Sequence, residues 1–399
     1  MRPSRWTLAQ VEAGSWIRRM FAEGQRLRAL HGPDSVADLA LGQPLEAPPA
    51  IREAFVRAAT DAPPGRFQYM PNAGYPEVRE RIVQEIGFPG LGIDSVALTT
   101  GAAGAISVAL KTFVQPGDEV VGITPYFSEF RLYCETAGLR FVPVPSHDDL
   151  TIDAPAVRAA LSDRTAAVII NTPSNPSGHV MSEGELRRLI AALETHNRRG
   201  HRRILLIVDE VYRRLIYPPA QQVDVLRLYE HTVLARSFSK DMGIAGERIG
   251  YLVLHPSLST PDVVNGVSLC MRALGYVNAP ATAQRALLHL ESWDVDCSPH
   301  RALRDEAYSA ALEAGLDLLE PEGALYLWAH SPWEDTVAFV HALAERRVLI
   351  TPGVAFGAPD RVRLCFSVPR RSLAMAMEVV AEVLRDGGGK GGIRTPGGA

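Results

Sequence analysis

Short apolar runs alternate with helix-like segments between residues 95 and 254. The runs are mostly aliphatic, which is typical of strands that are buried on both faces of a parallel sheet. The segments 103–113 and 183–194 have the length and the Ala and Leu content of crossover helices. This alternation predicts an α/β fold. The predicted strands are 95–99, 119–123, 166–170, 204–208, 232–235 and 249–254.

The pattern changes after residue 276. Long segments rich in Ala, Leu, Glu and Arg, at 279–291 and 301–314, precede short strand-like pieces at 324–328 and 362–367. We therefore predict a second, smaller α+β domain. The predicted division of the chain is an N-terminal segment that contributes to the small domain, a large domain, a small C-terminal domain and a disordered Gly-rich tail, at 1–44, 45–275, 276–386 and 387–399.

The start of the chain carries apolar residues at helical spacing among several arginines. Acidic residues among them argue against a transit peptide, so we predict a helix that packs on the rest of the fold. The apolar residues are Trp16, Ile17, Met20, Phe21 and Leu27.

The composition excludes several classes of partner. The formal net charge is -4, so the basic excess that binding to nucleic acid requires is absent. No apolar run approaches the roughly 20 residues that span a bilayer, and no export signal is apparent. The 4 cysteines are scattered without the spacing of a zinc site and indicate free thiols. We expect a cytoplasmic protein that binds a small molecule, without a metal, nucleic acid or membrane.

Four loops that follow predicted strands carry chemistry-bearing residues. A lysine and an arginine share the loop SFSKDMGIAGERIG at 237–250. Asp209 and Glu210 follow a strand at the sheet edge where α/β proteins bind ligands. The turn NTPSNPSG at 171–178 displays two Asn amides, and TGAAGA at 100–105 leaves backbone N–H groups open to an anion at a helix start. Each loop is weak evidence alone, but together they indicate one site.

In this order, the loops resemble those of the class I and II aminotransferases of pyridoxal 5'-phosphate (PLP) fold type I. The resemblance runs from about residue 15 to about residue 384. It implies a large domain with a mostly parallel, helix-covered sheet, a smaller α+β domain, PLP as cofactor and an α-amino acid as substrate. Further family-like segments are GQP at 42–44, Tyr69, GYPEVR at 74–79, PYF at 125–127, PEGA at 321–324, PG at 352–353, FG at 356–357 and RL at 363–364.

The resemblance implies roles for the residues around the cofactor ring. Lys240 matches the lysine that forms the Schiff base and later moves the substrate's Cα proton. Its amine must be uncharged to react, and the nearby Arg248 favours a lowered pKa. Asp209 matches the acid that keeps the pyridine nitrogen protonated. Asn175 and Tyr212 match the residues that hydrogen-bond the 3'-oxygen of the ring.

The same resemblance implies the contacts to the phosphate and to the ring face. Phe127 matches the aromatic residue that stacks on the ring, although Tyr126 beside it leaves the register open. Tyr69 matches a residue that reaches the phosphate of the neighbouring subunit, so we expect a homodimer with shared active sites. The predicted phosphate donors are the backbone N–H groups of Ala102 and Ala103 and the side chains of Ser237, Ser239 and Arg248.

Substrate contacts complete the implied site. Arg363 matches the arginine that binds the substrate α-carboxylate through both ends of its guanidinium. Arg361 has the same parity on the predicted strand and is the weaker candidate. Gly42 and Asn175 are expected beside the same carboxylate.

Two reactions share these residues. An aminotransferase, which moves an amino group between an amino acid and a 2-oxo acid, is the expected activity. The alternative is a β-elimination or cyclisation enzyme, similar to the capreomycidine synthases that cyclise a hydroxylated arginine in antibiotic biosynthesis. The side-chain pocket that separates them has no motif; Tyr126, Glu129 and residues 1–43 are candidates to line it.

Overall fold

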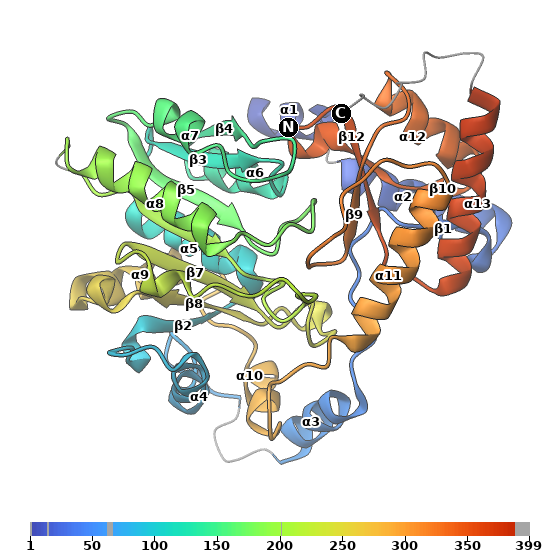
Figure 1. Ribbon diagram of the computed structural model, residues 1–399. Coiled ribbons are helices and arrows are strands. Elements are labelled where there is room, and N and C mark those ends of the chain that lie inside the picture. The colour runs from blue at the N-terminus through green and yellow to red at the C-terminus, as the bar shows by residue number, and fades with distance from the viewer. Residues whose placement is uncertain (1, 14–15, 62–66, 201, 388–399) are drawn as a thin grey trace.

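A seven-stranded sheet in the order β2-β8-β7-β6-β5-β3-β4 forms the centre of the larger part of the molecule (Figure 1). The computed structural model describes residues 2–13, 16–61, 67–200 and 202–387. All six predicted strands are present. β4 was not predicted, because it lies at the sheet edge with few buried side chains and two prolines. The strands are β2 Val96–Thr99, β3 Glu119–Thr124, β4 Arg140–Pro145, β5 Thr165–Asn171, β6 Leu205–Asp209, β7 Thr232–Ser237 and β8 Gly250–Leu254.

One strand departs from the parallel arrangement. β3, β4, β5, β6 and β7 pair in parallel, whereas β8 runs antiparallel to both β7 and β2. The connection from β7 to β8, residues 238–249, holds only a short 3-10 turn and no crossover helix. A parallel return needs a long crossover, so this connection brings the chain back antiparallel. The sheet is mostly parallel, as predicted.

Helices cover both faces of this sheet. Alternate residues of each strand enter separate hydrophobic clusters, as Ile207 and Leu206 of β6 do. Such two-sided burial explains why the strands have continuous apolar sequences. One face packs on α5 Gly101–Phe113, α6 Glu129–Thr136 and α9 Pro261–Ala273, and the other on α4 Pro76–Ile86, α7 Ala154–Ala160, α8 Glu183–Asn197 and α10 Ala281–Leu288.

A second, smaller group of strands and helices lies beside the large sheet (Figure 1). It holds an antiparallel sheet in the order β11-β12-β9 and a parallel pair of β1 with β10. The helices predicted at 279–291 and 301–314 correspond to α10 and α11. The elements are β1 Ala37–Asp38, β9 Tyr326–His330, β10 Val348–Leu349, β11 Thr351–Pro352, β12 Arg361–Cys365, α11 Ser298–Glu313, α12 Thr336–Glu345 and α13 Arg370–Gly387.

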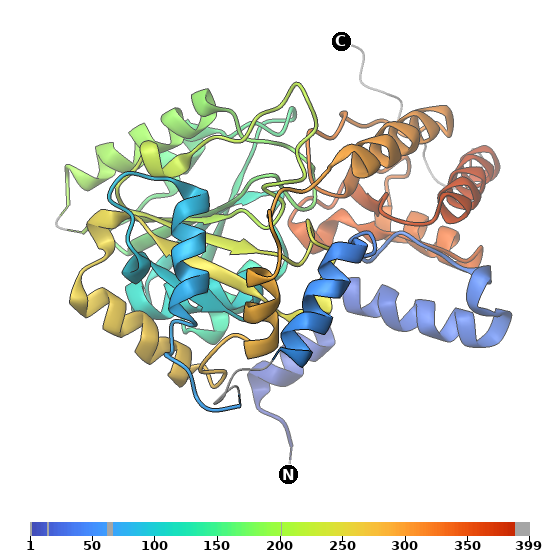
Figure 2. The same ribbon diagram turned by 90° about the horizontal axis from the view of Figure 1, so that it is seen from below.

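The N-terminal segment packs against this C-terminal group. Met20 and Leu27 of α2 Trp16–His31 share a hydrophobic cluster with Val380 of α13, and Figure 2 shows α2 beside the C-terminal helices. The remaining helices are α1 Arg5–Ala13 and α3 Pro49–Thr60. The domain boundaries at 44, 275 and 386 stay a prediction, and the predicted tail lies outside the described residues from 388 onward.

A half-buried histidine links the two groups of elements. His179, in the loop after β5, lies between the carboxylates of Glu185 on α8 and Glu322 in the loop before β9, at 3.0 Å and 2.9 Å. Burial by itself lowers the pKa of His179, but the two carboxylates outweigh it and raise the pKa to about 9. The imidazole is therefore charged at neutral pH and pairs with both acids.

This arrangement makes stability depend on alkaline pH. Because the folded pKa of His179 lies above its ordinary 6.5, its stabilisation is complete below about pH 6.5 and is lost as the pH rises through 9. We predict that His179→Gln lowers the free energy of unfolding by roughly 2–3 kcal/mol at pH 6.5, with a deficit that shrinks as the pH rises from 6.5 to 9 and is nearly absent above pH 9. Urea unfolding between pH 6 and 10 measures this. Replacement of the exposed His147 is the control, and a deficit that does not vary with pH contradicts the prediction.

Candidate active site

The carboxyl ends of β5, β6 and β7 meet at one wall of a cavity of about 530 Å³. The strands are in register there, with Asn171 opposite Asp209 and Asp209 opposite Ala235. The start of α5, helix α2 and strands β9 and β12 supply the other walls. The cavity collects almost all of the predicted site residues: Gly42, Ala102, Ala103, Phe127, Asn175, Asp209, Tyr212, Ser237, Ser239, Lys240, Arg248 and Arg363.

Lys240 lies in the loop after β7 with its amine deep in the structure. Its Nζ donates a hydrogen bond to the Gly42 carbonyl oxygen at 2.6 Å. Burial, with the charges of Arg363 and Arg248 adding to it, lowers the pKa of Lys240 to about 8. A substantial fraction of this amine is therefore neutral near pH 8, in a form that can attack a carbonyl or accept a proton.

Asp209 is the last residue of β6 and is a buried acid. Its Oδ1 accepts a hydrogen bond from the Val211 backbone N–H at 3.2 Å, and it forms no ion pair with any described residue. Burial raises its pKa to about 7, with Glu210 adding to the shift. Asn171 fixes the surrounding backbone, since its amide donates to the Asp209 carbonyl at 2.9 Å and accepts from the Asn175 N–H at 2.5 Å. The site presents a carboxyl group that needs a hydrogen-bonded or cationic partner.

One corner of the cavity is suited to an anion. Arg248 has a left-handed backbone (φ 54°), and its guanidinium donates to the carbonyls of Ala245 at 2.8 Å and Thr100 at 3.3 Å. Gly101 is needed beside it, because its φ is 79° and a Cβ there would lie 3.0 Å from Arg248 Nη2. The first N–H groups of α5 point to this corner, as helix starts do at phosphate sites. The hydroxyls of Ser237 and Ser239, 2.8 Å apart, also line it.

Arg363 provides a buried cation on the opposite side. The residue is 1% exposed, and its guanidinium donates to Asn175 Oδ1 at 2.8 Å and to the Ala40 carbonyl at 2.5 Å. The guanidinium carbon lies 4.4 Å and 4.7 Å from the ring centres of Tyr326 and Phe356. Its Nε has no hydrogen-bond partner, and no carboxylate among the described residues pairs with it. This geometry fits a ligand carboxylate.

The structure separates residues that the sequence left as alternatives. Phe127 lines the cavity, whereas Tyr126 packs edge-on against Phe141, with ring centres 4.7 Å apart. Of the two arginines on β12, Arg363 is among the described residues that line the cavity and Arg361 is not. Tyr69 is 98% exposed and lies outside the cavity of its own chain.

Tyr326 is a site residue that the sequence reasoning missed. Its hydroxyl lies 2.8 Å from the hydroxyl of Tyr212, and burial raises the pKa of both. It also explains Gly42, because any side chain at position 42 would collide with the Tyr326 hydroxyl. The available signal was the PEGA segment, which ends two residues before Tyr326. Tyr133 was missed as well, and Asn171, whose amide the sequence placed in the site, had been given no specific role.

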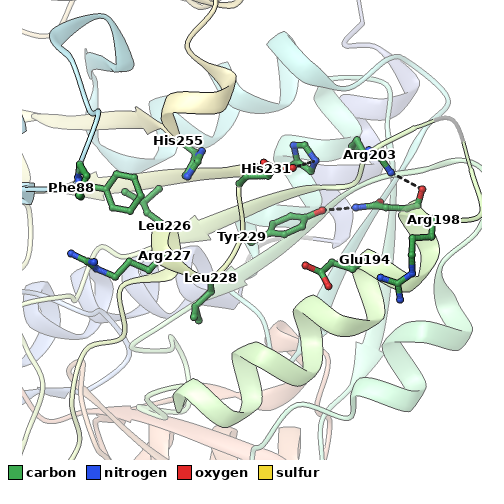
Figure 3. A pocket seen from close by; sticks show the side chains of 13 residues that line it. Phe88, Glu194, Arg198, Arg203, Leu226, Arg227, Leu228, Tyr229, His231 and His255 are labelled. Atoms are coloured by element: carbon green, nitrogen blue, oxygen red, sulfur yellow. Dashed lines mark hydrogen bonds and ion pairs between the residues drawn. The ribbon is translucent and has the colours of Figure 1, made fainter.

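A second cavity of about 610 Å³ lies at the opposite, amino ends of β6 and β7 (Figure 3). Its polar groups satisfy one another: Arg203 donates to the Asn197 carbonyl at 2.7 Å, and the Asn197 amide donates to the Tyr229 hydroxyl at 2.8 Å. None of the predicted site residues lines it. We therefore assign the chemistry to the cavity that contains Lys240.

Metal-binding clusters and membrane-spanning helices are both absent from the described residues. Among them, no group of three or more His, Cys, Asp or Glu side chains is placed to hold a metal ion. No helix among the same residues has the length and apolar character needed to cross a membrane.

Comparison with known proteins agrees with this geometry. A profile for "Aminotransferase class I and II" matches residues 34–380. The chain is 27% identical to a probable aspartate aminotransferase of Methanocaldococcus jannaschii, covering 87% of this chain and 92% of that one. It is 29% identical to an aromatic amino acid aminotransferase of Mycolicibacterium smegmatis, covering 81% of this chain and 83% of that one.

Solved structures give the same result. An aminotransferase of Eubacterium rectale superposes with a TM-score of 0.88 at 28% identity, covering 97% of this chain and 99% of that one. The Thermus thermophilus aspartate aminotransferase with maleate gives 0.83 at 26% identity, with 96% and 100% covered. These relatives are named as aminotransferases, which favours amino-group transfer over the elimination or cyclisation that the sequence left open.

The cavity fits the cofactor of this family. It combines a lysine with a lowered pKa, a buried acid without a cationic partner and an anion-binding corner. PLP has an aldehyde that a lysine can bind, a pyridine nitrogen that an acid can bind, and a phosphate that an anion-binding corner can hold. The chain belongs to the class I and II aminotransferase family, and it is a PLP-dependent transferase that acts on amino acids.

Proposed function

We propose that this cavity transfers an amino group between an α-amino acid and a 2-oxo acid, with Lys240, Asp209 and Arg363 as its principal residues. The observation that supports these roles is that all three line one cavity, with Asp209 and Arg363 buried and Lys240 partly buried, and each lacks the partner that a bound group would supply. Burying an amine, an acid and a guanidinium without such partners is unfavourable, which is typical of a functional site.

The residues proposed to hold PLP surround it on several sides. Asp209 would bond the pyridine nitrogen, Asn175 and Tyr212 the 3'-oxygen, and Phe127 would stack on the ring. When bound, PLP supplies an electron-withdrawing ring that stabilises negative charge at the substrate's Cα. The proposed phosphate contacts are the N–H groups of Ala102 and Ala103 and the side chains of Ser237, Ser239 and Arg248.

Lys240 is proposed to bind the cofactor covalently and to move the proton of the reaction. Its pKa of about 8 keeps the released amine basic enough to take a proton from Cα and close enough to neutral pH to return it. The Gly42 carbonyl that now accepts from Nζ holds the amine inside the cavity.

Arg363 is proposed to bind the substrate α-carboxylate together with Asn175 and Gly42. Its Nε has no hydrogen-bond partner, and its side chain lines the cavity; both observations support this role. The aromatic rings of Tyr326 and Phe356 hold the guanidinium in place. This clamp binds the α-carboxylate, which all amino acids share, and does not depend on the substrate's side chain. Some relatives are named for aspartate and others for aromatic amino acids, so their names do not identify the substrate of this chain.

A homodimer with shared sites is proposed from Tyr69. Tyr69 is 98% exposed, and the nearby Phe67 is 92% exposed. Such exposure is unusual for aromatic residues of a monomer. Tyr69 would reach the phosphate held by the partner subunit. We also propose a cytoplasmic location, since the scattered cysteines are free thiols.

Replacement of Lys240 with Ala tests the reaction. We expect amino transfer to fall by about 10²- to 10⁴-fold or more, because no other lysine among the described residues lines the cavity. The measurement is 2-oxo acid release from a panel of amino acids with 2-oxoglutarate as acceptor. Lys111→Ala, at an exposed position on α5, is the control. Undiminished release by the Lys240 variant, or a borohydride label on Lys111, rules out this role.

Replacement of Asp209 with Asn tests the buried acid without any turnover. Because its folded pKa of about 7 lies above the ordinary 3.8, the carboxyl destabilises the fold increasingly as the pH rises from 4 to 7. We expect the cofactor-free variant to be more stable than the wild type by about 2–4 kcal/mol at pH 8, and equally stable near pH 4. Urea unfolding measures both.

The control for this experiment has the opposite sign. A hydrogen bond from Arg202 holds the pKa of Asp118 below its ordinary value. Asp118→Asn is therefore expected to destabilise the protein at pH 8. If Asp209→Asn is destabilising in the same way, Asp209 is not an unpaired acid.

Replacement of Arg363 with Ala tests the carboxylate clamp. We expect amino-acid binding to weaken by about 2–5 kcal/mol, because a buried charge-assisted pair is lost, while PLP stays bound. Arg363→Lys keeps the charge without the fork and should give an intermediate affinity. Titration calorimetry measures affinity, and cofactor absorbance measures occupancy. Arg361→Ala is the matched control on the same strand; loss of PLP with unchanged substrate affinity refutes the assignment.

A further inference from the structure

Some charged residues that line the cavity have no role in the proposed binding of PLP and of the substrate α-carboxylate. The proposed contacts to PLP and to the α-carboxylate engage four charged residues and leave Arg18 and Glu129 without a role. An unassigned charge in an active-site cavity is a candidate to recognise the substrate side chain. The charged residues that line the cavity are Arg18, Glu129, Asp209, Lys240, Arg248 and Arg363.

Glu129 is a half-buried carboxylate that lacks a counter-charge. It is the first residue of α6, two residues beyond Phe127, and its side chain lines the cavity. Ser128 Oγ donates a hydrogen bond to Glu129 Oε2 at 2.5 Å. Among the described residues, the Glu129 carboxylate accepts no other side-chain hydrogen bond. No described Arg, Lys or His forms an ion pair with it. The charge of Glu129 is therefore available to a ligand.

Glu129 lines the same cavity as Tyr326 and Arg363, and its charge acts on two tyrosines there. Burial raises the pKa of Tyr326, and the Glu129 carboxylate adds to this shift. The same two causes raise the pKa of Tyr133. Tyr326 in turn packs against the guanidinium of Arg363, with 4.4 Å between its ring centre and the guanidinium carbon. Glu129 and the proposed α-carboxylate clamp therefore line one cavity, which a single amino acid can occupy.

Arg18 is the weaker selector. It lies on α2 at the cavity mouth, where its side chain is exposed, so water and salt screen its charge. The neighbouring Ile17 and Phe21 of the same helix also line the cavity. They add apolar surface on which the methylene groups of a long side chain can pack.

We propose that Glu129 makes this enzyme selective for amino acids with a cationic side chain, a guanidinium or an ammonium. A cation would form a charge-assisted hydrogen bond with the Glu129 carboxylate. Its methylene stem would contact Ile17 and Phe21. This inference rests on the proposed function, because it assumes that Arg363 holds the α-carboxylate.

A purely structural role for Glu129 makes a different prediction. An acid in the first turn of a helix stabilises that helix through the helix dipole. Loss of that effect would weaken the fold but would not change which side chain is preferred. The ratio between cationic and neutral ligands therefore separates the two roles.

The test compares side chains of matched shape on the holoenzyme. Arginine and citrulline differ only in the guanidinium and the neutral urea group, and glutamate supplies an acid. We expect kcat/KM for 2-oxo acid formation to be at least tenfold higher for arginine than for citrulline or glutamate. Glu129→Gln should remove this preference. Calorimetry with 5-guanidinopentanoate, 5-ureidopentanoate and glutarate, which lack the amino group and cannot react, should show the same order of affinity.

Two variants serve as controls. Glu135→Gln lies on the same helix, but its carboxylate pairs with Arg131 and Gln10 outside the cavity, so the arginine preference should stay. Arg18→Gln should change the ratio by less than about fivefold, since water and salt screen the charge of an exposed side chain.

The outcomes separate failure of this inference from failure of the proposed function. If 2-oxo acid forms but glutamate or citrulline is preferred, or if Glu129→Gln leaves the arginine preference unchanged, the inference is wrong and the transfer reaction stands. If no amino acid yields a 2-oxo acid while 5-guanidinopentanoate still binds through Glu129, the proposed reaction is wrong and the selectivity stands.

Discussion

Desolvation of charged groups is the constraint on which this site depends. Asp209 and Arg363 are buried and Lys240 is partly buried, and such surroundings disfavour the charged form of an amine or a carboxyl. Burial moves the pKa of the lysine down to about 8 and that of the aspartate up to about 7. Both groups therefore sit near the point where they exchange protons at neutral pH. The guanidinium of Arg363 is held by the Ala40 carbonyl, the Asn175 side-chain amide and two aromatic rings.

The site is enclosed because the two groups of elements pack together and both contribute walls of the cavity. The in-register ends of β5 and β6 carry Asn171 and Asp209 at the edge of the large sheet. β12 and β9 bring Arg363 and Tyr326 to face them from the smaller sheet. A helix near the N-terminus covers the mouth, because α2 packs on the C-terminal hydrophobic cluster. The site is thus built from segments that are distant in the sequence, and the His179 pairs with Glu185 and Glu322 hold both sides together.

Much of the fold was predictable from the apolar pattern. Strands buried on both faces have continuous apolar sequences, so six strands of the large sheet were found. β4 was missed because an edge strand with prolines lacks this pattern. The direction of β8 was not readable either, since strand direction depends on how the connection at 238–249 folds and not on the composition of the strand. The helix at the N-terminus was predicted from its spacing, because one face of α2 is buried.

By itself, the sequence determined the chemistry that is available: which residue types follow which strands, and hence the lysine, the acid, the anion-binding loop and the family they resemble. Only the tertiary structure decided which neighbours those groups have. Phe127 and Tyr126 are adjacent in sequence, yet one faces the cavity and the other faces Phe141. Tyr326 became a site residue only once β9 faced the cavity, and only the placement of α6 showed that Glu129, one of the sequence's candidates for the side-chain pocket, lines the cavity without a counter-charge. The physical reason is that burial and charge compensation are properties of the surroundings, and those surroundings come from distant parts of the chain.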